Sequence, residues 1–182
     1  EAEVPRDYAL QHLAQWITPN PEGLDLPHEQ DPERIREAID GIIRVIPEPA
    51  LGRSTIPGTG LTMLNLMQDA PFADQLLRPA LGHLGAWIKR TVLGQNPDAS
   101  EILRGEAIQT VGDFLLDEHA HYLRELAHDR RSSPDLRLRA IAALGDLGHP
   151  ADRAPLLQLA KSPGPLRDAV ISALGRLELR NP

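Results

Sequence analysis

The sequence predicts an all-α fold, an α-solenoid of about four stacked helix-turn-helix units in one domain over residues 1–182. The first observation is an internal sequence repeat: the segment "LRLRAIAALGDLG" at 136–148 is followed by the similar segment "LRDAVISALGRLE" at 166–178. The second is the spacing of apolar residues on one helix face, as at Leu136, Ala140 and Leu144. A unit of about thirty residues cannot cover its own apolar face, so its copies are expected to stack.

Two further segments extend the pattern toward the N-terminus. "LRGEAIQTVGDFL" at 103–115 matches the 136–148 copy after a shift of 33 residues, and "VPRDYALQHLAQW" at 4–16 is a weaker copy. Between the copies lie shorter amphipathic segments such as "PADRAPLLQLAKSPG" at 150–164, which predict the first helix of each unit. We therefore expect regular repeats over 96–182 and irregular ones over 1–95.

Apolar periodicity and helix-terminal residues also set the expected helix boundaries. Pro79 should kink or split the fourth helix, because proline has no backbone N–H to donate. Two proline-rich connections, 18–32 and 47–57, are longer than a repeat turn needs; they are interpreted as spacers or a cap, or alternatively as a recognition edge. Helices are expected at 5–17, 31–46, 57–68, 72–93, 98–116, 119–129, 134–147, 150–161 and 164–179.

Composition excludes several classes of partner. The formal net charge is -7 and no basic stripe is present, which argues against nucleic acid and against anionic membrane surfaces. No apolar run is long enough to predict membrane insertion. The chain has no cysteine, so thiol catalysis and disulfides are excluded. That absence, together with a first residue Glu1 rather than Met, is compatible with an exported or periplasmic protein, and the compartment stays open.

The pattern Leu-Arg-x-x-Ala-Ile-x-x-Leu-Gly-x-Leu at 136–147 resembles HEAT repeats, and among them the short HEAT-like repeats of the bilin-lyase type, most strongly over 98–179. The resemblance implies a right-handed superhelix whose second helices line a concave face, and a protein-interaction scaffold more than an enzyme. It also implies an inter-repeat polar ladder, or alternatively an anion-contacting row. The matching ladder positions are Arg104, Arg137 and Arg167, with Asp135 as the acidic partner.

The densest group of possible metal ligands lies in "LDEHAHYLRELAHDR" at 116–130. If this segment is helical, its acidic and histidine side chains share one face and could bind zinc or another divalent ion. The opposite face is apolar, so the alternative interpretation is a solvated face with local ion pairs. A metal-binding or enzymatic module on this row is the second hypothesis for the function. The row consists of Asp117, His121, Glu125 and His128.

No nucleophile motif or phosphate loop is present, and no cofactor is expected. A bilin-lyase-like activity is a remote alternative that follows from the resemblance alone. The first hypothesis is a non-enzymatic scaffold that presents its concave helical face to a protein or peptide; the partner's identity and the oligomeric state are left open. The residues expected on that face are Glu106, Gln109, Asp113, Arg139, Asp146, Ser172 and Arg176.

Overall fold

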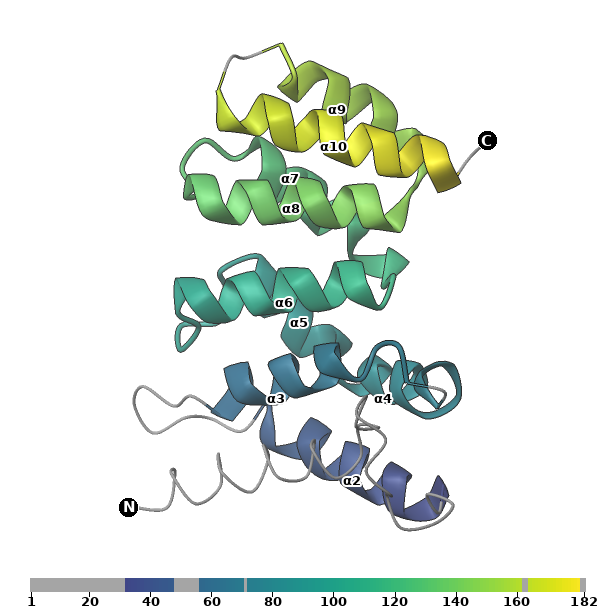
Figure 1. Ribbon diagram of the computed structural model, residues 1–182. Helices are drawn as coiled ribbons and strands as arrows, with labels where there is room; N and C mark the ends of the chain where they lie inside the picture. The colour runs from purple at the N-terminus through teal and green to yellow at the C-terminus, as the bar shows by residue number, and fades with distance from the viewer. Residues whose placement is uncertain (1–31, 48–55, 71, 162–163, 181–182) are drawn as a thin grey trace. The chain divides into compact units, whose positions relative to one another are not determined.

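The computed structural model describes residues 32–47, 56–70, 72–161 and 164–180 (Figure 1). Over these ranges all regular structure is helical, and helices follow one another in pairs, which confirms the predicted all-α fold class. The chain divides into two compact units, residues 1–87 and 88–182. A single domain over 1–182 therefore stays a prediction. The expected helix at 5–17 and most of both proline-rich connections lie outside the described residues.

The first unit is built on two amphipathic helices, α2 (Pro32–Val45) and α3 (Ile56–Leu66). Their apolar faces meet, and Ile39, Ile42 and Leu61 are almost completely buried. Gly60 allows this close approach, because a Cβ there would lie 2.6 Å from Cγ1 of Ile46. Glycine is thus retained inside α3 despite its low helix propensity.

Pro79 splits the predicted 72–93 helix into four short elements, as expected from its missing N–H. A π-helical turn ends just before Arg78, Pro79 is the second residue of the short α-helical segment that begins there, and a 3₁₀ turn separates this segment from the next α-helix. The predicted break is confirmed. In chain order the elements are η1 (Ala73–Leu77), α4 (Arg78–Leu81), η2 (Gly82–Leu84) and α5 (Gly85–Val92).

The second unit contains the regular repeats. Helix α8 packs against α6, α7 and α10, and Figure 1 shows α6, α8 and α10 in one layer with α7 and α9 behind α8 and α10. The bounds of α8 are those that the sequence predicts. The elements are α6 (Glu101–Asp113), η3 (Asp117–His119), α7 (Ala120–His128), α8 (Pro134–Leu147), η4 (Pro150–Asp152), α9 (Arg153–Leu159) and α10 (Pro165–Arg180).

Helices α6 and α8 begin and end in the same way, 33 residues apart. Ser100 and Ser133 are the N-caps, and their hydroxyls accept hydrogen bonds from the backbone N–H three residues later, at 3.1 and 3.3 Å. Both helices terminate at a left-handed residue, Leu115 (φ 54°) and Gly148 (φ 71°). Glycine adopts this conformation freely whereas leucine does so at a cost. The last residue of α6, Asp113, therefore lies three residues before the predicted 116.

Consecutive second helices cross at a glycine and an alanine. A Cβ on Gly112 would lie 3.1 Å from Cα of Ala143, and a Cβ on Gly145 would lie 2.7 Å from Cα of Ala173. Gly112 and Gly145 occupy the same repeat position, as do Ala143 and Ala173. The recurring glycine of the sequence motif is therefore explained by backbone-to-backbone contact between repeats, which sets the spacing of the α6–α8–α10 layer.

Candidate interaction face

The seven residues expected on the interaction face lie on the three helices of one layer. Each is exposed or half-buried, and none is in the core. We call this set the polar row: Glu106, Gln109 and Asp113 on α6, Arg139 and Asp146 on α8, and Ser172 and Arg176 on α10.

Arg176 connects the last two helices of the polar row. Its Nε lies 2.9 Å from Oδ1 of Asp146, and its Nη2 donates a hydrogen bond of 3.1 Å to the carbonyl oxygen of Ala142. Both partners are on α8. Because the guanidinium is held from two sides, its position on the surface is fixed by the packing of α10 on α8.

Arg139 similarly lies across the first two helices. It pairs with Asp135 one turn earlier, with Nε 3.0 Å from Oδ2, and its side chain covers Gly105 of α6, where a Cβ would meet Nε at 3.1 Å. On α6 itself, Nε2 of Gln109 donates to Oδ2 of Asp113 at 3.3 Å. The polar row is thus a surface of both charges whose arginines and acids are held by neighbouring groups.

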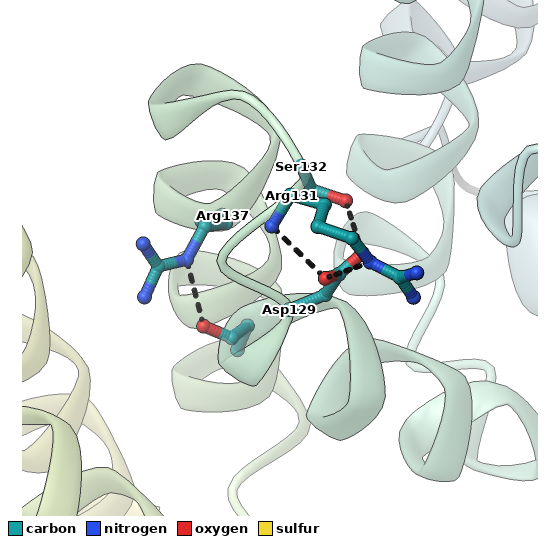
Figure 2. A network of polar contacts seen from close by, with 5 residues as sticks. Asp129, Arg131, Ser132 and Arg137 are labelled. Carbon is teal, nitrogen blue, oxygen red and sulfur yellow. Dashed lines mark hydrogen bonds and ion pairs between the residues drawn. The ribbon is translucent and has the colours of Figure 1, made fainter.

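The arginines expected to form a ladder between repeats make a different contact. Arg104 Nη2 donates to the carbonyl of Val92 at the end of α5, at 3.0 Å. Arg137 Nε donates to the carbonyl of Ala127 near the end of α7, also at 3.0 Å (Figure 2). Each contact joins the two helices of one pair. The last carbonyls of a helix have no partner within it, and a cation there is also favoured by the helix dipole.

Two details of the ladder prediction are corrected by these contacts. Asp135 is not the partner of Arg137, because the carboxylate of Asp135 is engaged by Arg139 on the next turn of α8. Arg167 is exposed and makes no side-chain hydrogen bond or ion pair within the part of the chain that the structure describes. Bonds across consecutive second helices come instead from Arg176 in the polar row.

The turn between α7 and α8 is organised by Asp129 (Figure 2). Its Oδ1 accepts a hydrogen bond of 3.0 Å from the backbone N–H of Arg131, and its Oδ2 accepts one of 3.1 Å from the hydroxyl of Ser132. The pKa of Asp129 is lowered, chiefly because the Arg131 N–H stabilises the carboxylate. This turn brings the start of α8 beside the end of α7, where Arg137 reaches the Ala127 carbonyl.

Comparison with known families agrees with the repeat pattern. Residues 91–175 match the family model of HEAT repeats. This part of the chain belongs to the HEAT-repeat family. The HEAT region so defined contains α6 to α9 and most of α10, and therefore the whole polar row except Arg176. A search among curated proteins finds no match. None of the described helices is both long and apolar enough to cross a membrane.

The predicted metal row of the HEAT region is divided between separate partners. Asp117 lies in the 3₁₀ turn η3, outside α7, and its Oδ1 is 3.1 Å from Nε2 of His149. His121 pairs with Glu125 at 3.2 Å, and His128 is exposed at the end of α7. Among the described residues, no three His, Asp or Glu side chains come together in a geometry that could hold a metal ion. The row matches the alternative interpretation of local ion pairs.

The structure shows one buried polar position that sequence reasoning missed. Asp152, at the end of η4, is fully buried, and its carboxylate pairs with the guanidinium of Arg124 from the preceding pair. Repeat alignment places His119 at the equivalent position, 33 residues earlier, and it is also buried. An alignment of the first helices, in addition to the second, would have revealed that this position is polar in both pairs.

His119 is buried, and neither of its ring nitrogens has a hydrogen-bond partner within the described structure. It lies beside Tyr122, at 6.2 Å between ring centroids, and beside the carboxylate of Glu118, at 3.8 Å. The pKa of His119 is lowered from 6.5, mainly because burial disfavours the imidazolium; Glu118 opposes this effect and Lys89 adds to it. His119 is therefore neutral in the folded protein at neutral pH.

We predict that His119 makes the protein less stable under mildly acidic conditions. Between the unfolded pKa near 6.5 and the lower folded value, the unfolded chain takes up a proton that the folded chain does not. The free energy of unfolding should therefore fall as pH is lowered from about 7.5 to about 5.5. Urea denaturation at both pH values measures this, and His119→Leu should show a smaller fall. An equal fall in the variant would assign the effect to other groups.

Proposed function

We propose that the HEAT region is a non-enzymatic scaffold that binds a protein or peptide through the polar row. The proposal is supported by the placement of seven polar side chains at the surface of three successive second helices, α6, α8 and α10, whose spacing is set by glycine–alanine contacts. A surface held in this way loses little conformational freedom on binding, so more of the contact energy is available for affinity.

The charges of the polar row indicate the kind of partner. Acidic groups lie on α6 and α8, and the arginines lie on α8 and α10, so the polar row is acidic on α6, of both signs on α8 and basic on α10. The Asp146–Arg176 pair already satisfies part of this charge within the protein. A polar segment carrying both acidic and basic residues complements such a surface better than a uniformly charged one.

Two exposed positions test the proposal without disturbing the ion pairs. Gln109 and Ser172 lie at opposite sides of the layer, on α6 and α10, and both are exposed. The double variant Gln109→Arg, Ser172→Arg places two bulky cations on the face. For peptides selected by display against the full chain, binding to this variant should weaken about tenfold or more, a loss of about 1.4 kcal/mol.

The matched control is Gln158→Arg, an equally exposed glutamine on the first helix α9, away from the polar row. Its affinity for the same peptides should stay within about twofold of the unmodified chain. Circular dichroism and thermal unfolding should be unchanged for both variants. Equal losses in the control and the double variant, or no loss in either, would place the binding surface elsewhere.

A further inference from the structure

The last helical pair carries most of the exposed large apolar side chains. Among the described residues there are five, of which Leu66 and Ile102 lie elsewhere and three lie on α9 and α10. The exposed fractions of those three are 44% for Leu157, 56% for Ile171 and 84% for Leu179. Terminal repeats of stacked folds normally present a polar outer side. We call the set Leu157, Ile171, Gly175 and Leu179 the end face.

Earlier repeats bury the positions equivalent to Ile171 and Gly175. Ile171 is equivalent by repeat alignment to Ile141 and Ile108, and both of these are completely buried. Leu179 is equivalent to Leu116, which is 7% exposed, and to His149, which is half-buried. The exposure of Ile171 therefore reflects the lack of a following helix on that side among the described elements, since the residue type is the same in all three repeats.

Gly175 gives the clearest comparison. It is equivalent to Gly112 and Gly145, each of which is contacted by an alanine of the next second helix. A Cβ on Gly175 would have nothing within 4 Å. Ile171, Gly175 and Leu179 are four residues apart and so line one side of α10. The end face thus repeats, in the same register, the surface on which α8 and α10 pack.

Two positions next to the end face indicate which residues a helical pair packed on it would need. Asp168 is equivalent to Leu138 of α8 and to Gly105 of α6, of which Gly105 is covered by Arg139 of the next second helix, and Asp168 has no ion pair within the described residues. Leu157 is equivalent to Arg124, which reaches Asp152 of the next pair. An occupant packed in the same register would place one residue against Asp168 and another against Leu157.

We propose that the end face binds a HEAT-type helical pair in the register of the preceding repeats. Its second helix presents alanine or glycine to Gly175 and an arginine, one turn earlier, to Asp168. Its first helix begins with an uncharged residue over Leu157, where an aspartate would be left unpaired. Arg139 and Ala143 of α8 have this one-turn spacing, so α8 itself is the model for the occupant's second helix.

The proposal can be tested by extending the chain with its own repeat. Leu177 is equivalent to Phe114, so residues 178–182 are replaced by a second copy of residues 115–148. The copied Leu116 then takes the place of Leu179, and the copied His119 meets Leu157. If the end face accepts this pair, the urea midpoint should rise by about 1 M, and amide hydrogen exchange in α10 should slow.

The control for the extension carries leucine in place of the copied Ala143, because the larger leucine side chain would clash with Gly175. It should lose the gain in midpoint and the slower exchange of α10. An extension without any gain would overturn the proposal. So would a concentration-dependent dimer of the unmodified chain, in sedimentation, that Gly175→Arg dissociates, because the end face would then be covered by a second copy. Monomeric behaviour of the unmodified chain is the expected result.

Discussion

Replacing Arg124 by methionine is expected to destabilise the HEAT region by about 3 kcal/mol or more. Asp152 is fully buried, and the guanidinium of Arg124, itself 33% exposed, is the cation paired with it. Removing the cation leaves a buried carboxylate without its counter-charge, and the penalty for such a group exceeds the energy of the lost pair. Urea denaturation of the variant and the unmodified chain measures the difference.

The double variant Arg124→Met, Asp152→Leu separates this explanation from a simple loss of packing. Once both charges are absent, no buried carboxylate is left uncompensated, and most of the stability should return. A double variant as unstable as Arg124→Met alone would show that the aliphatic part of Arg124, and not its charge, makes the contribution.

The second large effect is expected at the crossing of α8 and α10. Gly145→Ala places a methyl group 2.7 Å from Cα and 3.0 Å from the carbonyl oxygen of Ala173, so the backbone of α10 has to move. We expect a loss of about 1–3 kcal/mol, as for other overpacked sites, partly offset by the better helix propensity of alanine. Thermal or urea unfolding measures the loss.

Gly175→Ala is the matched control, since the same change is made at the equivalent position of the next helix. A Cβ there meets nothing within 4 Å, so only the propensity gain remains, and the variant should be more stable by about 0.5–1 kcal/mol. Gly112→Ala, with its nearest contact at 3.1 Å, should fall between the two. Effects of the same sign and size at Gly145 and Gly175 would contradict the packing argument.

The helices could be predicted from the sequence because their signals are local. Apolar periodicity, a serine N-cap and a following proline locate α8 within its own residues, and Pro79 interrupts the preceding helical segment by its own chemistry. The left-handed Leu115 was not predictable in this way, because leucine carries no turn signal. Only its alignment with Gly148 indicates that α6 must end there.

The partners of individual polar side chains were less predictable, because they depend on how far apart two helices lie. The motif placed Arg137 correctly near the start of a second helix, but its bond goes to the Ala127 carbonyl of its own pair. The burial of Asp152 likewise requires the position of Arg124 in the preceding pair. Such contacts join segments separated by a turn or a whole repeat, and helix periodicity does not encode that distance.

The glycine–alanine crossings have a consequence for how this surface can change. The backbone and methyl group of Ala143 lie against Gly112 of α6, and those of Ala173 lie against Gly145 of α8, so each crossing residue acts as a spacer for every helix beyond it. Exchanging Ala143 for glycine or serine would therefore alter the distance from Gln109 to Ser172 although neither of them is touched. The geometry of the polar row is accordingly open to adjustment from beneath the surface, through residues that are not part of it.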